Sequence, residues 1–499
     1  MNVSPNSNVP SAEVIRDITR RHFFGQAGLG LGTAALASLA DAEMQRSIAA
    51  QSGPQSALNQ PHLPGRAKRV IYIFQAGGPA QMELFDYKPE LAKLHGQELP
   101  PSVRDTQRLT GFTAKQGQFP IVASPFKFAR HGECGAWVSE LLPHLSTVVD
   151  ELCFIKSMHT EAINHDPAVT FLLTGSQQPG WPSIGSWLSY GIGSESRDLP
   201  AFVVLLTPGL IQDASTPLSA RHWGNGFLPA SHQGVQFRAG KNPVLYLANP
   251  GGIDRRTRRE MLDVTAELNR IQSASAGDPE IKARIEQYEM AFRMQASVPR
   301  LTDLTTETKA VFDMYGPQSR TPGTYAANCL LARRLVEQGV RFVQIFDRDW
   351  DHHRSEPKHM RTKANWFDQP TTALIQDLKM RGLLEDTLVV CGGEFGRTVY
   401  CQGPLQENYG RDHHGGCFTM WLAGAGVRSG HTHGVTDEFG YNVAEGPVHV
   451  HDLQATILHC LGIDHKRLTF QHQSRQFRLT DTAGRVVSEV LDGPSTMPT

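Results

Sequence analysis

The sequence lacks the features that define several common classes of protein. Its formal net charge is -1 over 499 residues, so there is no bulk electrostatic case for binding nucleic acid or an anionic membrane surface. No Cys-x-x-Cys pair occurs among the seven cysteines, so the sequence does not support a structural zinc knuckle. Beyond the N-terminal region, no apolar run is long enough to span a bilayer. A hydrophobic content of 40% with 46 glycines and 31 prolines fits a globular, loop-rich, enzyme-like chain.

The N-terminal region has the layout of an export signal. Arg20 and Arg21 precede a weakly apolar, glycine-rich run at residues 25–39, and an Ala-x-Ala sequence ends at Ala42. The alternative is a surface helix or a retained anchor, but the order of the parts favours export. We therefore expect residues 1–42 to direct the chain through the twin-arginine export machinery to the periplasm or the extracellular space, with no membrane span left after cleavage.

The remainder is predicted to form one domain. Residues 43–67 are polar and contain three prolines, so they are interpreted as a linker. The domain is expected at 68–492, with a short tail at 493–499. The stretch 252–338 is strongly helical and is interpreted as an insertion or cap beside the sheet.

Short apolar runs alternate with helical segments through this domain. Buried strands are predicted at residues 69–74, 201–206, 340–346, 387–391 and 418–422. Helices are predicted at 261–295 in two pieces, at 325–338 and, with Asp368 as its cap, at 368–381. The alternation is typical of an α/β fold with a largely parallel sheet covered by helices on both faces.

One crossover brings two polar clusters to the same edge of this sheet. The strand at 340–346, the helix at 368–381 and the strand at 387–391 form a βαβ unit, so the two strands are expected to be parallel near neighbours. The segment 347–353 follows the first strand and Glu394 follows the second. Ligands in open α/β sheets bind beyond the carboxyl ends of the strands, so this rim is the predicted site.

The segment after the first strand contains Asp351, His352 and His353. Carboxylate and imidazole together suit zinc, manganese or iron, whereas carboxylates alone suit calcium or magnesium. The alternative is a polar loop in which Asp351 caps a turn.

The second strand is followed by Glu394, Arg397, His413 and His414. The planar fork of Arg397 could hold an anionic oxygen, and the alternative is a buried Glu–Arg pair that fixes the loop.

His159, Asn164 and His165 precede a predicted helix at 168–173, whose N-terminus favours anions, and they suggest a ligand shell. The histidines between 431 and 451 are interpreted mostly as loop residues and caps.

Three blocks resemble the sulfatase and alkaline phosphatase superfamily. Residues 385–396 are similar to a strand that ends in Ser-Asp-His-Gly. Residues 452–463 are similar to the superfamily's Asp-Leu-x-Pro-Thr helix, and residues 165–175 are similar to its nucleophile segment. More closely, the chain resembles the exported bacterial family catalogued as domain of unknown function 1501, on residues 77–81, 85–89, 131–144, 350–353 and 394–398. The resemblance covers nearly all of 68–492 and implies a three-layer α/β/α, alkaline-phosphatase-like fold.

The chain also departs from the superfamily pattern. Gly77 and Gly78 stand where sulfatases have paired aspartates, and His165 stands at the nucleophile position. Glu394 and Phe395 replace an Asp-His pair, and no Cys-x-Pro-x-Arg occurs, so a formylglycine sulfatase is not supported. The two-metal, covalent-intermediate mechanism therefore does not transfer intact.

From these observations we predict an exported metal-dependent hydrolase of sulfate or phosphate esters, which can include esters on carbohydrate. Asp351, His353 and Glu394 are expected to bind a divalent ion (Zn, Ca, Mg or Mn), with His413 or His414 completing the shell.

The catalytic candidates are His165, as a second-site ligand, nucleophile or base, and Arg397, which would hold the ester oxyanion. The predicted substrate contacts are His159, Asn164 and His352. The alternative function is a non-catalytic scaffold with a degenerate sulfatase-like fold that binds a glycan or a protein. A third possible function is that of a phosphomutase or transferase.

Overall fold

The structure is a computed structural model that describes residues 56–211, 216, 218–240, 242–276 and 279–493. All features below belong to the compact unit at residues 54–499. The predicted export signal at 1–42 and the start of the predicted linker lie outside the described residues. Within the described part, no helix has the length and apolarity needed to cross a membrane.

The described residues form a central sheet of nine strands, eight of which run in the order β12-β4-β11-β8-β1-β7-β5-β6, with β15 beside β4. The strands are β1 (Arg69–Gln75), β4 (Leu152–His159), β5 (Phe202–Leu206), β6 (Val235–Phe237), β7 (Phe342–Asp347), β8 (Thr387–Gly392), β11 (Phe418–Ala423), β12 (His431–His433) and β15 (Val448–His449). Only β11 runs antiparallel to its neighbours, β4 and β8. The predicted α/β class with a mostly parallel sheet is confirmed, and all five predicted strands are present.

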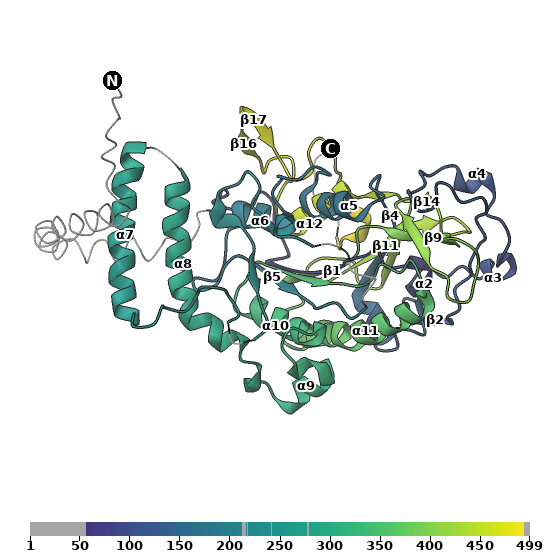
Figure 1. Ribbon diagram of the computed structural model, residues 1–499, viewed down its shortest axis with the longest axis horizontal. Helices are drawn as coiled ribbons and strands as arrows, with labels where there is room; N and C mark the ends of the chain where they lie inside the picture. Colours follow the sequence, from purple (N-terminus) through teal and green to yellow (C-terminus); the bar gives the residue numbers. More distant parts are fainter. Residues whose placement is uncertain (1–55, 212–215, 217, 241, 277–278, 494–499) are drawn as a thin grey trace, which may run out of the picture. The chain divides into compact units, whose positions relative to one another are not determined.

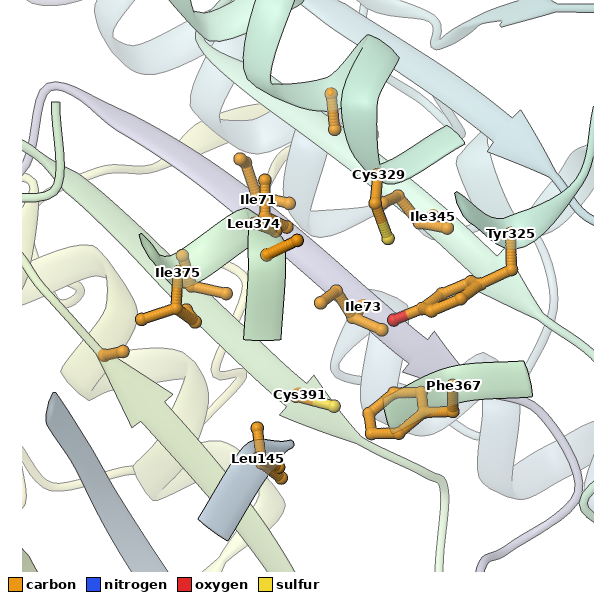
Figure 2. Close-up of a cluster of buried hydrophobic side chains, with 14 of the residues drawn as sticks. Ile71, Ile73, Leu145, Tyr325, Cys329, Ile345, Phe367, Leu374, Ile375 and Cys391 are labelled. Atoms are coloured by element: carbon orange, nitrogen blue, oxygen red, sulfur yellow. The ribbon is translucent and has the colours of Figure 1, made fainter. Parts of the chain in front are cut away.

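Helices cover both faces of the sheet, which makes three layers (Figure 1). One face carries α5 (His165–Thr174), α6 (Ile184–Ile192) and α12 (Val450–Cys460), and the other carries α10 (Tyr325–Glu337) and α11 (Glu356–Met380). Figure 2 shows the second of these cores, where Ile73 and Ile345 of the sheet face Tyr325 and Phe367 of the helices. The Tyr325 and Phe367 rings stack with centroids 5.5 Å apart. Each fully buried side chain of this size contributes roughly 1.5–3 kcal/mol of transfer free energy.

The predicted crossover is present and aligns two strand ends. Strands β7 and β8 both pair in parallel with β1, which lies between them. Gln75 is level with Asp347 and Phe74 is level with Gly392, so the segments that follow leave the sheet at one rim.

The predicted start of the crossover helix was wrong. Helix α11 begins at Glu356, and Asp368 lies in its interior. The Asp368 carboxylate accepts the backbone N–H groups of His144 (2.8 Å) and Leu145 (2.7 Å), so it caps the neighbouring 3-10 helix at Leu145–Glu151 rather than its own.

The predicted helical insertion has two parts. Helices α7 (Arg255–Ala276) and α8 (Pro279–Thr302) form a hairpin, and Arg259 pairs with Glu289 across it at 2.5 and 2.8 Å. Helix α10, which also lies in the predicted segment, instead packs on the sheet because residues such as Leu330 are fully buried there.

Residues 56–67, predicted as the end of the linker, lie against the domain through backbone bonds such as Ala57 N–H to Tyr190 O and Ala67 N–H to Cys460 O.

Candidate metal centre

Four segments meet at the rim beyond β7 and β8. The loop after β7 supplies Asp351 and His353, and the start of α5 supplies His165. An antiparallel pair, β9 (Gly396–Cys401) and β10 (Arg411–His414), places His413 opposite Arg397.

One ligand atom from each of His165, Asp351, His353 and His413 lies within 4.8 Å of the others. His353 Nε2 is 2.9 Å from His413 Nε2 and 2.9 Å from Asp351 Oδ1, and His413 Nε2 is 3.5 Å from the same oxygen. His165 Nε2 approaches the other carboxylate oxygen, Asp351 Oδ2, at 3.1 Å. Asp351 Oδ1, His353 Nε2 and His413 Nε2 therefore form the corners of a triangle, and the third imidazole, that of His165, contacts the other carboxylate oxygen.

Hydrogen bonds at the opposite ring nitrogen orient two of these imidazoles. His353 Nδ1 lies 2.6 Å from Gln402 Oε1, and His413 Nδ1 lies 3.0 Å from the carbonyl oxygen of Ile163. Both partners accept, so each Nδ1 is the donor and each Nε2 keeps its lone pair for the centre. Partners of this kind fix the tautomer and orientation of metal-binding histidines.

His165 is held by a carboxylate instead. Its Nδ1 lies 2.6 Å from Glu394 Oε1, and the fully buried Glu394 accepts the Gly77 N–H at 3.1 and 3.2 Å. Burial alone would lower the pKa of His165, but hydrogen bonds to Asp351 and Glu394 outweigh it and raise the pKa to about 9. Glu394, predicted as a ligand, thus stands behind His165 and outside the group of four.

Arg397 supports the carboxylate of the group. Its Nη2 is 2.6 Å from Asp351 Oδ1 and also bonds the Gly77 carbonyl, while Nε bonds Gly78 O at 2.8 Å and Nη1 bonds Arg411 O at 3.0 Å. Burial alone would raise the pKa of Asp351, but Arg397 and the surrounding histidines hold it well below its usual range. Against the residues that the structure describes, only one N–H of the guanidinium, on Nη1, is left for the predicted oxyanion contact.

Two predicted histidines point away from the group. His414 follows His413 in β10, and successive side chains of a strand face opposite sides. Its Nε2 lies 2.5 Å from Tyr441 O, and burial lowers its pKa to about 4. His352 Nε2 bonds Asp349 O at 2.9 Å, and burial lowers its pKa to about 3.

The other predicted contacts remain predictions. The His159 ring lies 5.2 Å from that of His449, in a separate group of histidines. Asn164 precedes α5 as its N-cap residue, but its side chain makes no capping hydrogen bond.

Sequence reasoning missed an aromatic side chain over the centre. Phe112 is 61% exposed, and its ring centroid lies 4.7 Å from that of His353 and 6.1 Å from that of His413. Thr110 and Thr113 flank it and both donate to the carboxylate of Asp412, the neighbour of His413. Because Phe112 lies about 240 residues before His353, in a segment with no strand or helix pattern, no signal in the sequence pointed to it.

The donor set suits a divalent ion. Zinc binds histidine nitrogen and carboxylate oxygen at about 2.0–2.2 Å in tetrahedral sites, which places ligand atoms about 3.3–3.6 Å apart. The separations of 2.9–3.5 Å around Asp351 Oδ1 are close to that spacing. Catalytic zinc sites keep three protein ligands and one open position, and Asp351, His353 and His413 fit this number.

A model of the family described as "Protein of unknown function (DUF1501)" matches residues 67–491. A comparison with curated proteins found no match. Solved structures similar to the chain include the phosphonate monoester hydrolase SpPMH from Silicibacter pomeroyi (12% identity, 86% of this chain and 78% of that chain, TM-score 0.32). Others are the lipoteichoic acid synthase LtaP from Listeria monocytogenes (9%, 86% and 78%, 0.31) and the PsFucS1 sulfatase from Pseudoalteromonas sp. (12%, 80% and 68%, 0.30).

Proposed function

The chain belongs to the family described as protein of unknown function (DUF1501), and we propose that its rim cluster is the metal centre of a phosphate or sulfate ester hydrolase. The observation that carries the proposal is the convergence of donor atoms from His165, Asp351, His353 and His413 at the carboxyl ends of parallel strands.

Asp351, His353 and His413 would hold the ion, and His353 and His413 arrive already oriented by Gln402 and Ile163. Two imidazoles and one carboxylate favour zinc over the oxygen-seeking ions calcium and magnesium. When bound, the ion supplies Lewis-acid stabilisation of charge on the ester oxygens.

His165 is proposed as the general acid. Its Nδ1–H stays with Glu394, and its buried Nε2 faces the centre, 3.1 Å from Asp351 Oδ2. With a pKa raised to about 9, the ring holds a proton on Nε2 at neutral pH and can pass it to the leaving oxygen.

Steady-state kinetics on two esters test this assignment. A His165→Gln variant should lose about 10²–10⁴-fold in rate on an alkyl ester, whose leaving oxygen needs a proton. The loss should be much smaller on a p-nitrophenyl ester, which leaves without one. His449→Gln serves as the matched histidine control, and an equal loss on both esters would contradict the role of His165 as the acid.

A non-catalytic binding scaffold is the second candidate. It is favoured by Arg397, whose guanidinium is committed to three carbonyls and Asp351, and by the glycines at 77 and 78. Stoichiometric metal with no turnover on a panel of phosphate and sulfate esters would favour the scaffold over the hydrolase.

Export is also part of the proposal and rests on the sequence order around Arg20 and Arg21. An Arg20→Lys/Arg21→Lys variant should accumulate inside the cell, while wild type appears outside the inner membrane. Equal export of both proteins would remove the twin-arginine assignment.

A further inference from the structure

A cavity opens directly beside the metal centre. It has a volume of about 600 Å³, and its lining includes His353, Phe112, Lys115, Arg354 and Gln402. His353 is thus shared between the proposed metal shell and the cavity wall.

The charge of the cavity is positive. Lys115 and Arg354 both line it, and neither forms an ion pair with any residue that the structure describes. No carboxylate stands among the described lining residues. Two cations without an ion pair among the described residues, beside the proposed metal centre, favour a ligand with a negative charge of its own, in addition to that of the ester.

The cavity also offers a flat apolar surface. The Phe112 side chain is 61% exposed, and the hydroxyls of Thr110 and Thr113 tie its loop to Asp412. A large aromatic group held in an exposed position provides a face on which a ring can stack.

Amide groups complete the lining. Gln402 uses its Oε1 to accept the His353 Nδ1–H, which leaves its Nε2 free of any hydrogen bond to the described residues. Asn408 also lines the cavity, and its side-chain amide forms no hydrogen bond with any residue that the structure describes. Side-chain amides can donate hydrogen bonds to ligand hydroxyl groups and accept hydrogen bonds from them. A hydroxylated ring therefore fits this wall better than an aryl group does.

We propose that this cavity is the leaving-group subsite and that it binds an acidic sugar, with the ring on Phe112 and the second anion at Lys115 and Arg354. The inference rests on the proposed function, because the ester of that sugar would occupy the metal centre. Gln402 then links the two, since one amide orients a metal ligand and contacts the leaving group.

Calorimetric titration of the full-length protein tests the subsite without any ester. Glucuronate, which carries the acid but no ester, should bind at least about tenfold more tightly than glucose, a difference of about 1.4 kcal/mol. Benzoate, an aromatic acid without hydroxyl groups, should bind more weakly than glucuronate. Binding can be measured without turnover. If the protein binds glucuronate but hydrolyses no ester, the proposed hydrolase function is wrong and the proposed sugar-binding site stands.

Three variants locate the binding. Lys115→Gln/Arg354→Gln should abolish the preference for glucuronate over glucose. Phe112→Ala should weaken the binding of both sugars about two- to tenfold. The control Arg256→Ala/Lys309→Ala removes the same charge from side chains that are 86% and 83% exposed and should leave the preference intact. The proposal is overturned if wild type binds glucose and glucuronate with equal affinity, or if the preference for glucuronate survives in Lys115→Gln/Arg354→Gln. Circular dichroism checks that each variant is folded.

Discussion

Two groups of histidines in this fold look alike in ring spacing and differ in chemistry. In the rim group, the ring of His413 lies 4.2 Å from that of His165 and 4.7 Å from that of His353. In a second group, the ring of His449 lies 5.2 Å from those of His159 and His451.

The nitrogen atoms separate the two groups. In the second group, His449 Nε2 pairs with Glu161 at 2.9 Å and His451 Nε2 bonds the Gly175 carbonyl at 2.9 Å, so each ring serves a different partner. In the rim group, Nδ1 is occupied and the Nε2 atoms converge on one carboxylate. Ring proximity alone therefore does not distinguish the two groups, whereas the convergence of Nε2 atoms on one carboxylate makes the rim group the candidate metal site.

The largest effect should come from Asp351, the point on which the rim group converges. Asp351→Asn should remove the bound ion and ester hydrolysis together, because the only carboxylate of the shell loses its charge. Elemental analysis and activity assays measure both. Glu161→Gln makes the same change in the second group and should keep full metal content; loss of metal there as well would erase the distinction between the groups.

A smaller effect is expected from Gln402, which only orients His353. Gln402→Ala should weaken metal affinity about 10–100-fold, the usual cost of removing an outer-shell partner. Competition with a chelator gives the affinity. Gln406→Ala, on the wall of the same cavity, should change it little, and a similar loss in both would point to general damage to the loop.

The stability of the metal-free protein should depend on pH through His165. Its folded pKa of about 9 lies above the usual 6.5, so its contribution to the free energy of unfolding is complete below pH 6.5 and is lost as pH rises through about 9. Thermal melts with chelator present should show a midpoint that falls across this window. His165→Asn should flatten the fall, and an unchanged slope would show that another group is responsible.

The smallest effect is expected in the second histidine group. His449→Ala should leave metal content unchanged and cost about 1–2 kcal/mol of stability, because it removes the N-cap of α12 and an ion pair whose partner, Glu161, is 58% exposed. Chemical denaturation measures the cost. A drop in metal content would join this group to the rim site.

The sequence predicted the strands and the rim well, because buried strands are short apolar runs and a βαβ crossover has one handedness. It did not separate His413 from His414, since their opposite directions depend on the pairing of β10 with β9. Glu394 was taken for a ligand because its position after a strand is visible, whereas its bond to His165, 229 residues away, is not.

Long-range contacts explain the other differences too. Asp368 has the local pattern of a helix cap, yet the N–H groups that it accepts belong to a segment 223 and 224 residues away. Gln402 and Phe112 act on His353 only in the folded chain. Local patterns therefore located the site, and tertiary contacts decided which residues form it.

The most direct test of the central claim is the metal content of the purified wild-type protein, measured by elemental mass spectrometry after exhaustive dialysis. One divalent ion per chain, with zinc expected, is the predicted result. Less than a tenth of an ion per chain, even after incubation with zinc or manganese, would contradict a metal centre formed by Asp351, His353 and His413.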